Sequence, residues 1–152
     1  GFMVGSPGQT VEHLAQDLKF IEKFQPEMCG IGPFIPHRET PFRDAPAGTV
    51  ELTCYLLSII RLIRPNILLP ATTALGTIDP MGREQGILAG ANVVMPNLSP
   101  ADVRDKYSIY DNKRATGAES VECINLLERE LSSIGYHIDY SRGDFQKYYD
   151  NE

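Results

Sequence analysis

The feature that most constrains the fold of this chain is a regular alternation of short apolar runs with helical patterns. Strands are expected at 1–5, 28–32, 67–71 and 91–95, and each interval between them has the periodicity of a helix. Strands that alternate with helices are typical of a parallel sheet with right-handed crossovers. The expected fold class is therefore α/β.

The first two helices are indicated by their start and stop signals. Thr10 can cap the first helix, whose apolar residues recur at three- and four-residue steps until Pro26 stops the pattern. A proline-rich loop at 33–47 precedes the second amphipathic helix, which is expected over roughly 49–64. Each of these helices follows a predicted strand.

The later helices have similar signals. Asp79 as N-cap and Pro80 at the first helical position predict a third helix that ends at Gly90. A last helix is expected over 118–134, closed by Gly135. Ser99 and Pro100 repeat the cap-plus-proline signal for a short helical turn after the fourth strand, so these elements make about four βα units and a C-terminal helix.

Four βα units amount to half of an eight-unit barrel. We therefore predict a partial (β/α) TIM-type barrel over residues 1–140 and a polar C-terminal tail over 141–152. A four-stranded parallel sheet alone would leave two bare edges. Either the chain dimerises through these edges or further strands precede it, and the second interpretation is preferred because the chain begins within a strand.

Charge and cysteine usage narrow the class of partner. A formal net charge of -6 over 152 residues argues against a nucleic-acid or anionic-membrane surface. No apolar run approaches the roughly 18 to 20 residues that span a bilayer. Cys29, Cys54 and Cys123 are too widely spaced for a disulfide framework or a zinc site, which favours a reducing cytoplasm. The expected partner is a small molecule or another protein.

In a parallel β/α architecture the functional site lies at the carboxyl ends of the strands. The turn at 5–10 has glycines that allow close backbone approach, although a simple tight turn is the more frequent explanation. Thr72 and Thr73 place two hydroxyls after the third strand, where they can bond a ligand or cap a turn. Met95 fits a ligand contact or, more simply, a packed core methionine.

Other candidate residues are weaker. His37 is the best placed histidine, but without an acidic partner at ligand spacing a solvated loop histidine is the simpler interpretation. We find no nucleophile-base pair, paired catalytic carboxylates, phosphate-binding loop or metal motif. Spacing alone therefore predicts no catalytic residue and no metal ligand in this chain.

Five sequence blocks are more specific together than any of them alone. In chain order they are GFMVGSPGQT, IGPFIPHRETPF, LLPATTALGTI, GANVVMPNLSP and YSIYDNK. This series resembles the C-terminal half of the HydE maturases of FeFe hydrogenase, which are close relatives of biotin synthase. The first two blocks are shared with methylornithine synthases, whereas the last three are more specific. The resemblance covers nearly the whole chain.

The resemblance implies a radical S-adenosylmethionine (SAM) enzyme, in which an iron-sulfur cluster on a CxxxCxxC loop reduces SAM to methionine and a 5′-deoxyadenosyl radical. That motif is absent from this chain and belongs to the N-terminal half of the family, so the chain alone is expected to be inactive. Matching motifs place four residues beside SAM. They are Met3, Gly5, Ile31 and Gly32.

The resemblance also implies a substrate site and partners. Residues that would line the cavity for the radical's target are Thr72, Thr73, Met95 and Tyr110. In the family the target is a cysteine-derived iron carbonyl-cyanide complex, supplied by HydG and passed on to HydF. The N-terminal half of the same protein is a further implied partner. Two alternatives stay open: a biotin synthase or methylornithine synthase-like enzyme, and a non-catalytic half-barrel that pairs with itself.

Overall fold

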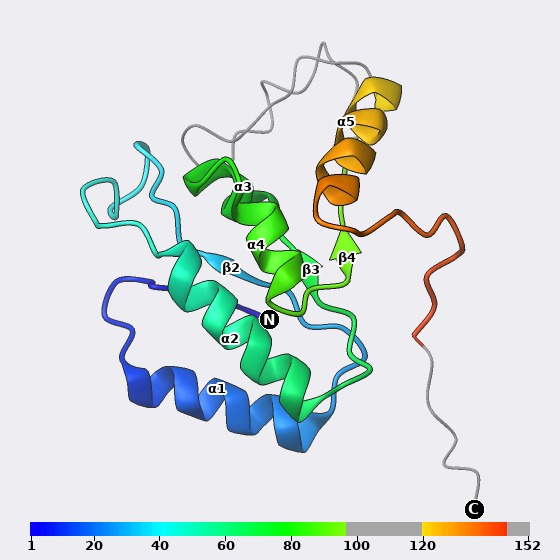
Figure 1. The fold of residues 1–152 in the computed structure, drawn as a ribbon. Coiled ribbons are helices and arrows are strands. Elements are labelled where there is room, and N and C mark those ends of the chain that lie inside the picture. The colour runs from blue at the N-terminus through cyan, green and yellow to red at the C-terminus, as the bar shows by residue number, and fades with distance from the viewer. Residues whose placement is uncertain (97–119, 146–152) are drawn as a thin grey trace, which may run out of the picture.

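The computed structural model of the chain describes residues 1–96 and 120–145, in which strands and helices alternate (Figure 1). The strands are β1 (Phe2–Val4), β2 (Ile31–Pro33), β3 (Pro70–Ala71) and β4 (Val93–Val94). The helices are α1 (Val11–Phe24), α2 (Val50–Ile63), α3 (Thr73–Ile78), α4 (Gly82–Leu88) and α5 (Ser120–Ser133).

The described strands are parallel, as predicted. β1 pairs with β2, and β3 pairs with β4. Met28 and Leu68 form an isolated parallel bridge between the two pairs, where the Cys29 N–H donates to the Leu68 carbonyl over 3.0 Å. The α/β class is confirmed. The described strands form no closed barrel, so the partial barrel stays a prediction.

The first two helices begin where their caps predict. Thr10 Oγ1 accepts from the His13 N–H at 3.4 Å, and His13 Nδ1 accepts from the Thr10 N–H at 3.2 Å. Thr49 Oγ1 accepts from the Leu52 N–H at 3.1 Å. These bonds satisfy amides that have no partner within the first helical turn, so each helix has a defined start.

The segment between β3 and β4 differs from its prediction. The sequence favours a turn at Thr72 and Thr73, followed by one helix that begins at Asp79 and Pro80. Instead, α3 starts at Thr73 and ends at Ile78, and a separate helix, α4, starts at Gly82. The capping role predicted for Asp79 and Pro80 is therefore wrong, and a short helix was missed.

The physical reason lies in the break between the two helices. Asp79 Oδ1 accepts from the Met81 N–H at 2.8 Å, so its carboxylate stabilises the break itself. A Cβ at Gly82 would lie 2.2 Å from the Leu75 carbonyl oxygen, so only glycine lets α4 begin this close to α3. This tertiary contact has no counterpart in local capping signals.

The two faces of the strands differ in burial. Val4, Ile31 and Leu69 are buried in one core cluster with side chains from α1, α2, α4 and α5. Met3 and Met28, by contrast, are 58% and 49% exposed. Parallel sheets normally have both faces covered. β1 has one buried and one exposed face, whereas both residues of β3 are buried.

Helix α5 stands beside α4 (Figure 1). Arg83 Nη1 lies 2.7 Å from Glu130 Oε2, in an ion pair whose side chains are 16% and 13% exposed. Gly135 follows the helix with a φ of 82°, the left-handed conformation that its predicted role in closing the helix requires. None of the described helices is long and apolar enough to cross a membrane.

Candidate ligand site at the carboxyl ends of the strands

Most of the predicted site residues that the structure describes lie at or just after the carboxyl ends of the parallel strands, and Ile31 is the exception because it begins β2. Because parallel strands point the same way, their carboxyl ends share one side of the sheet. We call this set the rim: Met3, Gly5, Ile31, Gly32, Thr72, Thr73 and Met95. Tyr110, the eighth predicted residue, lies outside the described residues.

Gly32 and Thr72 approach each other closely within the rim. A Cβ at Gly32 would lie 2.5 Å from Thr72 Oγ1, so the missing side chain is what admits the hydroxyl. Thr72 precedes α3, but its side chain makes no capping bond. Its Oγ1 is buried and has no hydrogen-bond partner among the described residues. Such a group costs free energy that a hydrogen-bonding ligand would offset.

The end of β1 is held by Gln9. The Gly5 N–H donates to Gln9 Oε1 at 2.6 Å, and Gln9 Nε2 donates to the Met3 carbonyl at 3.0 Å. Gly5 has a φ of 80°, and a Cβ there would lie 2.6 Å from Gly48 Cα. Both the conformation and the contact require glycine at this position.

The remaining rim residues differ in what they can offer a ligand. Ile31 is 1% exposed and belongs to the core, so only its backbone is available at the rim. The side chains of Met3 and Met95 are 58% and 52% exposed. Thioethers are flexible and polarizable, which suits them to packing against a bound ring.

His37 has a structural role in the loop after β2. Its Nδ1 accepts from the Glu39 N–H at 3.1 Å, and its carbonyl accepts from the Thr40 hydroxyl at 2.8 Å. These contacts agree with a loop histidine rather than a ligand or base, although the side chain is half-buried and not fully solvated.

The described cysteines do not fit an iron-sulfur cluster. Within 1–96 and 120–145 no group of three or more His, Cys, Asp or Glu side chains could hold a metal ion. Cys29 and Cys54 are free thiols, and burial raises the pKa of both. A protonated thiol is a poor metal ligand. The described residues therefore offer no ligand set for such a cluster.

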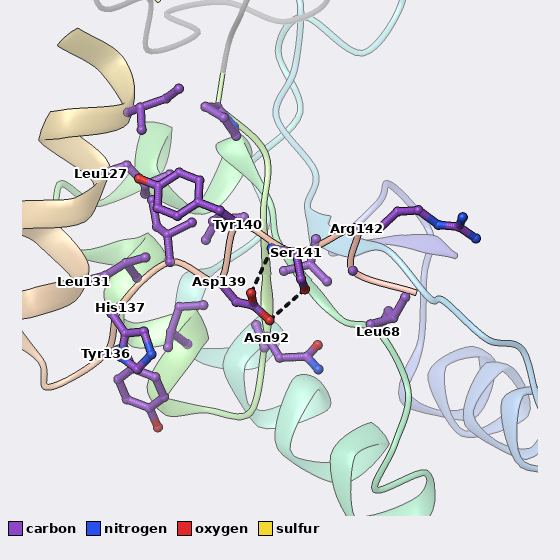
Figure 2. A pocket seen from close by; sticks show the side chains of 18 of the residues that line it. Leu68, Asn92, Leu127, Leu131, Tyr136, His137, Asp139, Tyr140, Ser141 and Arg142 are labelled. Atoms are coloured by element: carbon purple, nitrogen blue, oxygen red, sulfur yellow. Dashed lines mark hydrogen bonds between the residues drawn. The ribbon is translucent and has the colours of Figure 1, made fainter. Parts of the chain in front are cut away.

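A cavity of about 960 Å³ lies between β4, α5 and residues 136–144 (Figure 2). Several polar groups on its wall are already paired. Asp139 Oδ1 accepts from the Ser141 N–H at 2.8 Å, and the Tyr140 hydroxyl lies 3.4 Å from the Glu128 carboxylate. No rim residue lines this cavity. The rim is the better candidate because the unpartnered hydroxyl and the glycine contacts lie there.

Comparison with curated proteins tests the family resemblance that the five sequence blocks indicate. The chain is 41% identical over 135 residues, or 89% of its length, to the [FeFe] hydrogenase maturase subunit HydE of Thermotoga maritima. The chain is a relative of the HydE maturases. This HydE-like chain spans 39% of the length of that protein. The resemblance indicated by the five blocks is confirmed.

Two 3-methylornithine synthases are also similar to the HydE-like chain. The protein from Methanosarcina acetivorans is 30% identical over 95 residues, 62% of this chain and 26% of that one. The protein from Methanosarcina barkeri is 32% identical over 107 residues, 68% of this chain and 29% of that one. These relatives support a place in the radical SAM superfamily. No protein-family model matches the chain.

Sequence reasoning missed two residues that shape the rim. From the sequence, Gln9 belongs only to the predicted turn at 5–10, and no motif assigns a role to Gly48. A Cβ at Gly48 would lie 2.0 Å from the Val4 carbonyl oxygen, and the Gly48 N–H donates to the Phe34 carbonyl at 2.8 Å. Gly48 follows a long loop, and no local spacing connects it to β1. The glutamine directly before a helix cap was a visible signal for Gln9.

Proposed function

We propose that the HydE-like chain is the C-terminal part of a radical SAM enzyme of FeFe-hydrogenase maturation. The observation that carries the proposal is the 41% identity to HydE over 89% of the chain. Because the chain spans 39% of that relative, the activity is proposed for the whole protein. This stretch alone is proposed to be inactive, since its sequence has no CxxxCxxC motif.

SAM is proposed to bind at the ends of β1 and β2, beside Met3, Gly5, Ile31 and Gly32. Two features support this fit. Gly5 and Gly32 have no side chain, and Gly48 and Thr72 fill the space of their missing Cβ atoms, so these two residues would offer SAM backbone groups only. The exposed Met3 thioether can pack against the same ring. SAM, when bound and reduced, supplies the radical; these residues bind and orient it.

The radical's target is proposed to be a small cysteine-derived organometallic iron compound, held by Thr72, Thr73, Met95 and Tyr110. The orphaned hydroxyl of Thr72 supports a polar ligand at this point, because it can donate or accept a hydrogen bond. Hydroxyls and thioethers hold such a compound without ligating it tightly. HydG as supplier and HydF as acceptor, in the cytoplasm, are part of the proposal.

The exposed face of the strands is proposed to be the inner surface of a barrel. Residues 1–140 would form its C-terminal half, and residues 141–152 a tail. The exposure of Met3 and Met28 supports this arrangement, because a parallel sheet is normally covered on both faces. The N-terminal half of the protein would then complete the barrel.

A second candidate is a methylornithine synthase-like enzyme, favoured by the similarity to the two Methanosarcina proteins. Radical initiation would be the same, and the target would differ. The identity is lower, 30% and 32%, and covers less of the chain than the match to HydE. We therefore rank this candidate second.

The decisive experiment compares two forms of the protein after anaerobic reconstitution with iron and sulfide. One is this chain, and the other is the product of the full natural reading frame. Under reduction, only the full form is expected to bind a cluster and release 5′-deoxyadenosine from SAM. A full form that binds no cluster and leaves SAM intact would refute the enzyme and favour a binding module. Formation of 3-methylornithine would instead support the second candidate.

A further inference from the structure

We infer that Gln9 is the positioning residue that fixes the Met3–Gly5 backbone for SAM. This inference rests on the proposed function and deepens it. Gln9 is part-buried in the turn between β1 and α1, directly before the Thr10 cap. It is not among the residues predicted to touch SAM.

The two edges of β1 have different hydrogen-bond partners at its carboxyl end. On one side, the Val4 carbonyl accepts from the Phe34 N–H at 2.8 Å, which continues the pairing of β1 with β2. On the opposite side, the Met3 carbonyl and the Gly5 N–H both bond to the carboxamide of Gln9, at 3.0 and 2.6 Å. Alternate residues of a strand direct their polar groups to opposite edges.

The Gln9 carboxamide therefore takes the place of a residue on a neighbouring parallel strand. In a parallel ladder, the residue opposite position i donates its N–H to the carbonyl of residue i−1. The same residue accepts with its carbonyl from the N–H of residue i+1. Gln9 makes this same pair of bonds across Val4. Among the described residues β1 pairs with β2 alone, so Gln9 satisfies the other edge at the rim.

This arrangement links the side chain to ligand binding. Gly5 adopts a φ of 80°, a conformation that an unrestrained glycine leaves easily. The short bond from its N–H holds this conformation, while Gly48 closes the space behind it. Without Gln9, SAM itself would have to order the backbone that is proposed to contact it. The cost of this ordering would weaken SAM binding and leave the later chemical step unaltered.

The test uses the protein from the full natural reading frame, reconstituted anaerobically, with SAM as the probe. Gln9→Met keeps the volume and removes both hydrogen bonds. Gln16→Met, on the exposed surface of α1, is the matched control. Equilibrium dialysis is expected to give a Kd for SAM roughly tenfold higher in Gln9→Met, from the loss of two hydrogen bonds. The control should bind as the wild type does, and kcat at saturating SAM should stay within about twofold in both.

A second variant keeps the inference testable if Gln9→Met does not fold. In Gln9→Glu the carboxylate can accept from Gly5 but cannot donate to Met3. Protonation restores a donor, so its SAM affinity relative to wild type should improve as the pH falls from 7 toward the ordinary glutamate pKa of about 4.3. A flat ratio across this range would contradict the role.

The outcomes separate the inference from the proposed function. If wild-type protein does not bind SAM, the proposed function fails and the role of Gln9 falls with it. If wild type binds SAM and Gln9→Met has the same Kd, only the positioning role is overturned. A lowered melting temperature with an unchanged Kd would show a purely structural residue, and it also overturns the inference.

Discussion

At the amino ends of β3 and β4, the Arg61 side chain donates three hydrogen bonds to the backbone, and only its Nη2 is buried without a described partner. At the carboxyl ends of β2 and β3, by contrast, the buried hydroxyl of Thr72 has no described partner. The first region is built around Arg61, which lies on α2. The second is built around Gly32 and Thr72. The contrast matches a general division in parallel β/α folds, where one end of the strands serves stability and the other serves function.

Arg61 organises the amino ends through three hydrogen bonds. Its Nε donates to the Gly90 carbonyl at 2.9 Å, and its Nη1 donates to the carbonyls of Pro65 and Ile67 at 2.7 and 2.8 Å. Burial lowers the pKa of the guanidinium, which shows that desolvation partly offsets these bonds. One side chain thus ties the end of α2 to the chain segments that enter β3 and β4.

The largest expected effect is from Arg61→Met. This change should lower the free energy of unfolding by about 3 kcal/mol, because three carbonyls lose a charged donor. Urea denaturation measures it. The matched control is Arg43→Met, because the Arg43 side chain is 66% exposed and pairs with the exposed Asp44; a loss of about 0.5 kcal/mol or less is expected there. Equal losses in both variants would contradict the special role of the amino ends.

At the rim, Gly32→Ala is expected to cost about 2 kcal/mol, because the new Cβ would lie 2.5 Å from Thr72 Oγ1. In a Thr72→Ala background the same change should cost at least about 1 kcal/mol less, since the clashing oxygen is gone. Gly30→Ala is the control, because a Cβ there meets nothing within 4 Å. Additive losses in the double variant would show that Gly32 and Thr72 are not in contact.

Thr72→Val should have the opposite sign. Replacing a buried hydroxyl that has no partner is expected to raise the free energy of unfolding by about 1 kcal/mol. The control is Thr53→Val on α2, where Oγ1 donates to the Thr49 carbonyl at 2.8 Å. That variant should lose about 1 kcal/mol. If urea denaturation shows the same loss of unfolding free energy for both variants, the Thr72 hydroxyl is hydrogen-bonded. The rim would then not differ from the rest of the fold in this respect.

The smallest expected effect concerns Asp139, which lies near Leu68 and Asn92 (Figure 2). The Ser141 backbone N–H, followed by its hydroxyl, lowers the pKa of this exposed carboxyl. Its small stabilising contribution is therefore complete above the ordinary aspartate pKa and is lost as the pH falls through the lowered value. In Ser141→Ala the pKa should rise but stay below the ordinary value, because the backbone donor remains. NMR titration of the carboxyl measures this, and an unshifted wild-type pKa would refute the bond.

Prediction from sequence succeeded where the deciding interactions are local. Thr10 and Thr49 cap α1 and α2 because a hydroxyl reaches an amide three residues ahead in any such helix. It failed at Asp79 because the start of α4 depends on the contact between Gly82 and Leu75. The same difference applies to the rim, where glycines and threonines were recognised as candidates but the contact between Gly32 and Thr72 was not foreseen.

By itself, the sequence determined the alternation of strands and helices, the starts of the first two helices and the resemblance to the HydE maturases. These features depend on periodicity, capping and residue identity, which are properties of neighbours along the chain. Only the tertiary structure decided that Gln9 satisfies the outer edge of β1 and that Thr72 Oγ1 lies unpartnered beside Gly32. Such pairings depend on how closely separate segments pack, because a difference of one methyl group decides whether a glycine position can admit a neighbouring atom.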